Sequence, residues 1–500
     1  MLKKLPVLFL LFVFLAVSCP APTPEPNPVN PPEITEPDPD PVYLEDLDWG
    51  TRRFYPDWLV LTPGNDTTEL MLNWHSETGS TPAVAKVRFY GGEYDFQELT
   101  GTAQPNTSPP AYRAFSLNRV TVTGLKADTE YKYWVSSDGV NWSDRDGYTY
   151  KSPKTDSFRF AAISDPQLAA GNNEGTYPAG MLTRLVWLET MQKIGQANVN
   201  FIASSGDQID DTIAGSQNQY EWFFTPPALR SLPYAPTVGN HDRHYNFRLH
   251  YNMPNELTFE PLMGSEYGNV NNEQYAEIES VAHYWYRYNN ALFVVLNSSA
   301  APANTDAAVP YIERFEQTLT AAKAASPGYT WLFVQHHKST TCVGEHCGDG
   351  DVYRYVYAGF EELMSDHGVD FVLAGHDHGY TRSYPMTGKK GGTPSVPDRT
   401  QNGSVINNPN GVLYFTLPTT TGVKYYNTFT TTSQIYPFLA DGTAGQANLS
   451  ASNKPIANNI YNYAKIPGYM IVDVEGNQVS FNFYQINDTT TPVDSFVVTK

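Results

Sequence analysis

The chain has 500 residues, of which 41% are hydrophobic and 14% aromatic, so it can build more than one buried core. Its 52 acidic residues outnumber its 32 lysines and arginines, which gives a net charge of −20. That acidity favours solubility and argues against a nucleic-acid polymer or an anionic membrane surface as a partner. A small phosphorylated substrate stays compatible if metal ions supply local positive charge. No pattern indicates an obligate protein partner.

The first residues indicate an export signal, predicted to span residues 1–18. Two lysines precede an apolar run from Leu8 to Val17, which is too short for a permanent membrane span. Cys19 directly follows a small residue, as in bacterial lipoproteins. This predicts lipidation of Cys19 and a membrane-anchored lipoprotein, periplasmic or at the cell surface. Ala16 stands where leucine is commoner, so ordinary secretion with cleavage nearby is the alternative.

Residues 19–45 are rich in Pro, Glu, Asp and Asn and predict an extended tether. Residues 46–154 then predict an all-β domain, with short strands between Gly, Asn, Asp and Ser breaks at 70–74, 85–90, 118–123 and 130–135. The stretch from Gly124 to Tyr133 resembles the corner of a fibronectin type III sandwich, where a tyrosine bonds back to the preceding turn. Trp74 would fill the core. This domain has no cluster of His, Asp or Cys, so a structural or substrate-framing role is expected.

Residues 155–500 alternate strands with helices, which predicts a layered α/β domain. Strands are expected at 158–163, 199–203, 291–296, 331–334 and 371–374, and helices at 182–194, 311–325 and 355–367. Residues 388–459 are rich in Gly, Thr, Asn and Pro and are expected to form long loops. A hairpin of 469–474 and 479–484 is expected to close the domain.

Polar motifs directly follow five apolar segments of this domain. They are Ser164-Asp165-Pro-Gln167, Gly206-Asp207-Gln-Ile-Asp210, Gly239-Asn240-His241-Asp242, Gln335-His336-His337 and Gly375-His376-Asp-His378. Chemistry in open α/β sheets sits at the carboxyl ends of strands. An isolated His-x-His pair is most often a surface feature, whereas five such motifs in this order form a specific signature.

On these motifs the chain resembles the calcineurin-like metallophosphoesterases. Within that superfamily it is similar to the purple acid phosphatases, which carry an N-terminal fibronectin-like domain. Tyr380, Arg382 and the ending Thr491-Pro-Val-Asp-Ser-Phe496 fit that branch. The resemblance implies a four-layer α/β/β/α metallophosphoesterase sandwich preceded by an all-β fibronectin III-like sandwich.

The resemblance also implies two divalent or trivalent metal ions, iron, manganese or zinc, bridged by Asp207. One metal position would be held by Asn240, His336 and His376, and the other by Asp165 and His378. Two such ions polarise a phosphoryl group and activate a hydroxide for attack on phosphorus. The leading hypothesis is therefore hydrolysis of phosphomonoesters. A phosphodiesterase on the same centre is the close alternative, and a surface binding or adhesion lipoprotein with a degenerate phosphatase fold is the alternative of another class.

Two departures from the family concern the position of Asp165 and His378. Most members have Asp-x-His at the first motif, where this chain has Gln167. Purple acid phosphatases place a tyrosine three residues after the bridging aspartate, where this chain has Asp210. Either Gln167 or Asp210 could fill the gap. Without tyrosinate-to-iron charge transfer, the protein is expected to be colourless.

Several neighbouring residues are candidates for catalysis or substrate binding. His241 could contact phosphate or protonate the leaving group. His346 lies near the spacing at which related phosphatases carry a substrate or leaving-group donor, with a solvent-exposed loop histidine as the alternative. His337 could donate to phosphate or support the ligands; His336 is ranked as the ligand because His-x-Pro is the usual pattern, although a lysine replaces that proline here. Arg382 could pair with phosphate or pack against loops.

The remaining polar residues are expected to be structural. Asp242 and Asp377 are expected to support the ligands rather than bind metal. Outside the cytoplasm, Cys342 and Cys347 predict a disulfide rather than a metal clip. Such a disulfide would stiffen the loop that carries His346.

Overall fold

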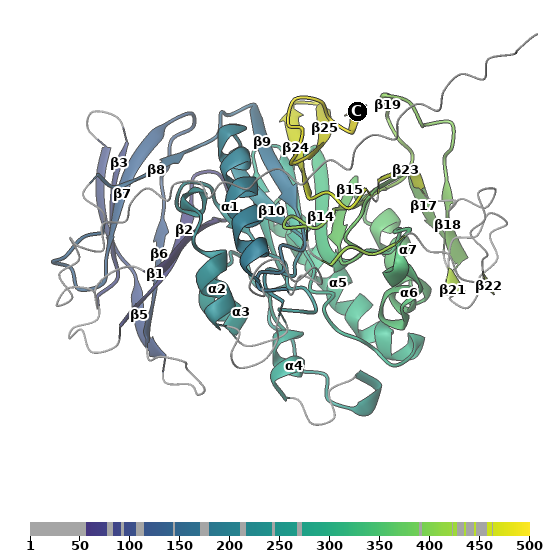
Figure 1. Cartoon of the computed structure of the whole chain (residues 1–500), viewed down its shortest axis with the longest axis horizontal. Coiled ribbons are helices and arrows are strands. Elements are labelled where there is room, and N and C mark those ends of the chain that lie inside the picture. The colour runs from purple at the N-terminus through teal and green to yellow at the C-terminus, as the bar shows by residue number, and fades with distance from the viewer. Residues whose placement is uncertain are drawn as a thin grey trace, which may run out of the picture. The chain divides into compact units, whose positions relative to one another are not determined.

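The computed structural model describes residues 57–77, 84–91, 95–106, 115–143, 146–170, 180–210, 217–242, 246–267, 273–389, 393–422, 424–427, 435–436, 445–446, 458–462 and 464–500 (Figure 1). The predicted export signal, Cys19 and the tether lie outside these residues and stay predictions. None of the described helices is long and apolar enough to cross a membrane.

The first described domain is a sandwich of two antiparallel sheets. One sheet has the order β1 (Asp57–Pro63), β2 (Leu70–Glu77), β6 (Phe115–Val122), β5 (Thr102–Asn106), and the other β4 (Asp95–Thr100), β3 (Lys86–Gly91), β7 (Glu130–Ser136), β8 (Tyr148–Lys151). Trp74 is fully buried between them. The Lys126 N–H donates to the hydroxyl of Tyr131 at 2.7 Å, which confirms the predicted tyrosine corner.

Two mixed seven-stranded sheets form the second domain (Figure 1). The first has the order β11 (Tyr234–Ala235), β10 (Phe201–Ser204), β9 (Ser157–Ile163), β24 (Gly468–Glu475), β25 (Gln478–Gln485), β26 (Asp494–Thr499), β19 (Val405–Asn407). The second has the order β12 (Tyr284–Tyr288), β13 (Ala291–Val295), β14 (Trp331–Lys338), β15 (Phe371–Gly375), β20 (Leu413–Thr416), β16 (Tyr380–Ser383), β23 (Asn458–Asn462). Two ribbons, β17 (Met386–Lys389) with β18 (Thr393–Pro397) and β21 (Ile435–Tyr436) with β22 (Gly445–Gln446), stand outside them.

Aromatic side chains join the two large sheets face to face. The ring of Phe160 on β9 lies 5.6 Å from that of Phe333 on β14, and Phe371 on β15 lies 4.9 Å from Phe481 on β25. All four side chains are buried. Because large aromatic groups contribute much of the area removed from water, this layer is expected to dominate the domain's stability.

Helices cover the outer faces of the sheets. Helix α1 (Met181–Gln196) packs on the first sheet, and α5 (Thr305–Ala325), α6 (Gly350–Tyr357) and α7 (Phe360–Asp366) form a second core with the other sheet. The short elements are α2 (Gln217–Phe223), α3 (Asn246–His250), α4 (Glu273–Ile278) and the 3₁₀ turns η3 (Pro227–Arg230), η4 (Ser265–Tyr267) and η5 (Glu345–Gly348). The structure confirms the predicted α/β/β/α sandwich, which follows an all-β domain along the chain.

Three predicted elements differ from the structure. The helix expected at 355–367 is two helices, because Gly359 adopts a left-handed φ of +102° between them. Strand β14 continues to Lys338, so its two histidines belong to the strand rather than to a loop after it. The segment 388–459, expected to be loops, contributes the buried strand β20 beside β15. Its apolar run of four residues was hidden by the polar composition around it.

A buried ion pair links the two large sheets. Arg382 of β16 donates to both carboxylate oxygens of Asp494 on β26, at 2.8 and 3.1 Å. The Tyr380 hydroxyl donates to the same carboxylate at 2.8 Å, and the guanidinium lies 4.0 Å from the ring centre of Phe496. Arg382 is 2% exposed. The prediction that Arg382 contacts substrate is therefore wrong: the strand order brings it into the core.

Replacing Asp494 with alanine should leave the Arg382 guanidinium buried without its counter-ion. We expect the free energy of unfolding to fall by about 3–5 kcal/mol. Urea denaturation followed by circular dichroism measures this. As a control, Glu98 pairs with Lys86 and Arg88 on the exposed face of the first domain, and Glu98→Ala should change stability little. Equal losses in the two variants would contradict the assigned role.

Candidate metal centre

The first two polar motifs are locked together through their backbones. The N–H of Asp165 donates to the carbonyl of Gly206 at 3.0 Å, and that of Gln167 donates to Asp207 at 2.9 Å. The Asp210 N–H returns a bond to Leu168 at 3.0 Å. These bonds extend the parallel pairing of β9 and β10 beyond both strands. The two carboxylates of Asp165 and Asp207 are therefore held at the same edge of the sheet.

Five of the predicted metal ligands adopt positive φ angles. The values are +49° for Asp165, +37° for Gln167, +53° for Asp207, +73° for His376 and +54° for His378. Such conformations are costly for residues with side chains and persist where the surrounding structure imposes them. Gly375 is required beside them, because a Cβ there would collide with Ser164 and with the Asp165 carboxylate.

Three consecutive threonines hold the turn that carries Asp165. After β20, the hydroxyl of Thr419 donates to the Asp165 carbonyl at 2.8 Å and that of Thr421 to Pro166 at 2.6 Å. The hydroxyl of Thr420 donates to Ser164. This clamp was not predicted, although the threonines come shortly after the apolar run of β20, as the other motifs come after theirs.

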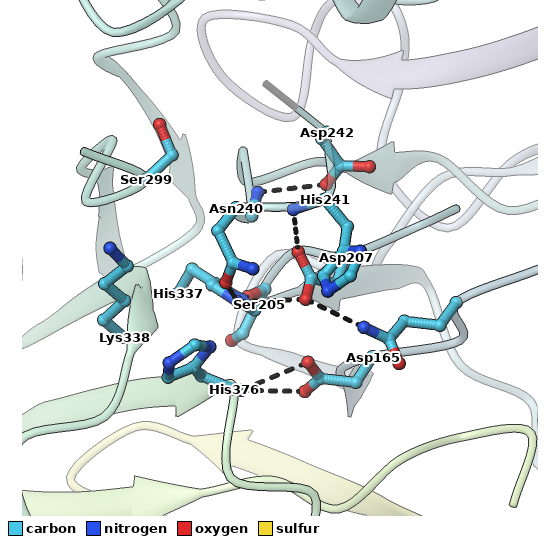
Figure 2. Close-up of polar contacts among 12 residues, drawn as sticks. Asp165, Ser205, Asp207, Asn240, His241, Asp242, Ser299, His337, Lys338 and His376 are labelled. Atoms are coloured by element: carbon cyan, nitrogen blue, oxygen red, sulfur yellow. Dashed lines mark hydrogen bonds and ion pairs between the residues drawn. The ribbon is translucent and has the colours of Figure 1, made fainter. Parts of the chain in front are cut away.

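One group of ligand atoms gathers around His337 (Figure 2). Its Nε2 lies 3.2 Å from Asp207 Oδ2 and 3.0 Å from Asn240 Oδ1. Its Nδ1 lies 2.7 Å from the Ser205 carbonyl, which can only accept, so Nδ1 carries a proton. Burial alone would lower the pKa of His337, but the charge of Asp207 outweighs it and raises the pKa to about 9, so without a metal ion the ring carries a second proton on Nε2. A metal ion between these groups would replace that proton. Ligand atoms of Asp207, His337 and His376 all lie within 4.8 Å of one another.

Buried acceptors that converge in this way call for a cation between them. His376 supports the same conclusion, because its Nε2 is buried and finds no hydrogen-bond partner among the described residues. Burial lowers the pKa of His376 well below its usual value, with further lowering from His346 and His337, so the ring is neutral and able to bind metal. The donor set at this position therefore fits a metal ion.

The structure corrects the ranking of the two adjacent histidines. His336 points to the opposite face of β14, where its ring lies 4.6 Å from that of Phe360 on α7. Burial lowers the pKa of His336 to about 3, with a smaller effect from His337, so it is a neutral core side chain. Side chains alternate along a strand, and Gln335 packs between the sheets against Ser204. His337, two residues on, therefore faces the centre and His336 cannot.

A second group of ligand atoms lies around Asp165. The His378 Nε2 is 3.3 Å from Asp165 Oδ1, while its Nδ1 donates to the carbonyl of Lys424. The backbone N–H of His376 donates to both Asp165 oxygens, at 3.2 and 3.0 Å. Gln167 Nε2 donates to Asp207 Oδ2 at 3.2 Å. The Asp207 carboxylate thus contacts side chains of both groups, as expected of a bridge.

The charge of Asp207 is stabilised although the side chain is buried. Burial alone would raise its pKa, but the charges of His337 and His241 outweigh it and hold the pKa well below the usual range. The His241 N–H donates to Asp207 Oδ1 at 2.8 Å. Burial, together with the charge of nearby Asp207, raises the pKa of Asp242 to about 8. Asp242 accepts from the N–H groups of Gln208 and Gly239, which is the structural role that was expected.

Asp210 and His241 lie together at the rim. The His241 Nδ1 donates to the Asp210 carbonyl at 2.7 Å and lies 3.8 Å from Oδ1 of its carboxylate. That carboxylate pairs with the ammonium group of Lys424. Lys424 was not predicted as a site residue, because only the folded chain brings it beside Asp210.

The loop that carries His346 is closed by a disulfide between Cys342 and Cys347. Asp377 accepts from the N–H groups of Gly344 at 2.6 Å and His346 at 3.1 Å, so the residue between the two ligand histidines also holds this loop. His346 Nδ1 lies 2.6 Å from Asp349 Oδ2.

His346 is half-buried and lies against the centre. Its ring lies 4.4 Å from that of His376 and 4.3 Å from that of Tyr426. Tyr426, a residue that the sequence analysis missed, also lies 4.6 Å from the ring of His378. The alternative of a solvent-exposed loop histidine is therefore wrong.

Comparisons with known proteins agree with this geometry. Residues 158–380 match the calcineurin-like phosphoesterase family, and residues 56–149 match the N-terminal domain of purple acid phosphatases. A human protein, acid phosphatase type 7, is 25% identical over 297 residues, which is 55% of this chain and 58% of that protein. The zebrafish (Danio rerio) protein of the same name is 23% identical, covering 68% of this chain and 73% of its own. The chain thus spans little more than half of the human relative.

Solved structures share the fold. A purple acid phosphatase from yellow lupin (Lupinus luteus) seeds superposes with a TM-score of 0.63 at 14% identity, covering 89% of this chain and 74% of its own. PhoD superposes with a TM-score of 0.55 at 12% identity, covering 89% of this chain and 91% of its own.

The α/β/β/α sandwich and the carboxylate, amide and imidazole groups that converge at its strand ends are the arrangement expected of a metallophosphoesterase domain. The chain carries a calcineurin-like phosphoesterase domain and the N-terminal domain of purple acid phosphatases.

The two histidines on opposite faces of β14 provide a matched test. Replacing His337 with phenylalanine removes a ligand, so metal affinity should fall by at least about a hundredfold. Replacing His336 with phenylalanine extends the packing on Phe360 and should leave metal binding unchanged. Metal analysis after equilibrium dialysis measures both variants. Retained metal in His337→Phe together with loss in His336→Phe would reverse the assignment.

Proposed function

We propose that this protein hydrolyses phosphomonoesters at a dinuclear metal centre. The observation that carries the proposal is the Asp207 carboxylate, which contacts His337 of one ligand group and Gln167 of the other. Two ions, when bound, supply Lewis acidity toward a phosphoryl oxygen and lower the pKa of a water molecule. Asn240, His337 and His376 would hold one ion, and Asp165 and His378 the other. Iron, manganese and zinc all suit such mixed oxygen and imidazole donors.

His346 is proposed as the proton donor to the leaving group. Asp349 and the N–H bond to Asp377 orient it, and its ring stacks on that of His376, so it borders the phosphate position. A positioned general acid needs this combination of proximity and fixed orientation. The disulfide then restricts the loop on which the donor sits.

The groups at the rim favour a monoester over a diester. A monoester phosphate carries up to two negative charges near neutral pH and a diester only one. His241 and His346 lie beside the ligand groups and can donate hydrogen bonds to the additional charged oxygen of a monoester. The name of the human and zebrafish relatives, acid phosphatase, supports the same substrate class.

Substrate class and metal dependence can be measured together. The purified protein should lose activity on dialysis against a chelator and recover it with manganese, zinc or iron. It should hydrolyse an aryl phosphomonoester with a kcat/KM at least about tenfold above that for the matching diester, because the additional negative charge of the monoester is attracted to the metal ions and to the histidine donors. A preference for the diester would establish the phosphodiesterase alternative. No bound metal and no turnover would instead favour a binding protein with a degenerate fold.

The role of His346 depends on the leaving group. His346→Asn should lower kcat for an alkyl phosphate by about a hundredfold, because an alkoxide leaves poorly without a proton. Loss for a nitro-substituted aryl phosphate should be far smaller, since that phenolate leaves unprotonated. His367→Asn, at the distant end of α7, is the control and should change neither rate. An equal loss for both substrates would show that His346 does not act as the acid.

A further inference from the structure

Gln167 presents a buried, unused oxygen next to the bridging carboxylate. The side chain is fully buried, and its Nε2 donates to Asp207 Oδ2 at 3.2 Å. A carboxylate oxygen only accepts, so the reverse amide orientation would place two oxygens against each other. The free atom is therefore Oε1, and it has no hydrogen-bond partner among the residues that the structure describes. A buried amide oxygen without a partner is costly, and a metal ion would satisfy it.

Asp210 is already engaged by other groups. Its carboxylate pairs with Lys424, its N–H donates to the Leu168 carbonyl, and its own carbonyl accepts from His241. A metal ion would have to compete with the ammonium group for this carboxylate. Its side chain is also 23% exposed, whereas that of Gln167 is buried beside Asp207.

Lys424 contacts both Asp210 and His378. The Lys424 carbonyl accepts the Nδ1 proton of His378, which orients that ring toward Asp165. Lys424 adopts a φ of +57°, a conformation that needs support from its surroundings. The same residue thus holds Asp210 through its side chain and His378 through its backbone.

We propose that Gln167, through Oε1, is the third protein ligand of the ion held by Asp165 and His378, and that Lys424 keeps Asp210 out of that ligand set. This inference rests on the proposed dinuclear centre and deepens it. Lys424 is a positioning residue, because it acts through His378 and Asp210. The pairing also accounts for Asp210 at the position where related phosphatases have a tyrosine.

Gln167 as a ligand affects which ion charge the position can balance. Amide oxygen is a neutral donor, whereas a tyrosinate is anionic. With Gln167 the position has fewer negative charges to balance a trivalent ion, and oxygen and imidazole donors of this kind suit divalent metals such as manganese and zinc. The centre is therefore expected to take two divalent ions.

Metal counting on the full chain tests the proposal independently of activity. Metal-free protein is reloaded with Mn²⁺ alone, and bound metal is measured by elemental analysis after dialysis. Gln167→Leu should lower the content from about two to about one ion per chain. Gln167→Glu also lacks the amide N–H to Asp207 but restores an oxygen donor, so it should keep both ions. The difference between these variants isolates the oxygen. Asp210→Asn should keep both ions.

A second measurement does not rely on the count. The electron paramagnetic resonance spectrum of the Mn²⁺-loaded wild type should show two coupled ions, and that of Gln167→Leu an isolated one. Circular dichroism confirms that each variant is folded; if Gln167→Leu is unfolded, Gln167→Ala replaces it. Retention of both ions in folded Gln167→Leu overturns the proposal, loss of an ion in Asp210→Asn overturns the exclusion of Asp210, and a wild type that binds one ion only overturns both. If the wild type binds two ions but hydrolyses no phosphomonoester, the proposed function fails while the ligand assignment stands.

Discussion

The buried carboxylate of Asp207 is the constraint on which the rest of the site depends. It has no solvent around it, and its neighbours include another acceptor, the Asn240 amide oxygen, reaching toward the same His337 nitrogen. Burying acceptors against one another costs free energy that packing alone does not return. The arrangement is stable only with positive charge in its midst, from protonated His337 or from metal ions. Metal binding at this centre and folding of the turns that carry its ligands are therefore coupled.

Elements far away in sequence stabilise the turns that carry these buried groups. The Asp165 turn has a strained backbone, and the threonines after β20 satisfy the carbonyls that this turn exposes. Strand β20 is fixed in turn between β15 and β16, and Arg382 of β16 is tied to Asp494 near the end of the chain. The last strands therefore belong to the support of the metal centre as much as to the core.

Local patterns were enough to predict the ligand-bearing turns, and tertiary contacts decided the rest. The motifs of Asp165, Asp207 and His376 directly follow apolar strands, so these residues could be found without knowing the fold. The choice between His336 and His337 depends on which face of β14 each side chain occupies. Gln335, which packs between the sheets, fixes that alternation. The alternation rule could have supplied it, had the strand been extended to Lys338.

Residues paired across long separations could not be predicted in the same way. Arg382 looks like a phosphate contact until β26 is placed beside it, since nothing local identifies Asp494 as its partner. The same holds for Lys424, which meets Asp210 only because the chain after β20 returns to the rim. Strand β20 itself was masked by the Gly, Thr, Asn and Pro residues around a short apolar run. Arg382 was therefore misassigned and Lys424 was missed, because in each case the partner in the folded chain was unknown.

The charge of the whole chain bears on the order in which this site can work. At a net charge of −20, the protein as a whole repels a phosphate dianion, and Asp165 and Asp207 add two negative charges at the place where phosphate must bind. The ammonium of Lys424 does not offset them, because Asp210 already neutralises it. Metal ions bound at the ligand groups would supply the positive charge that a phosphate needs at this place. We therefore expect metal binding to precede substrate binding.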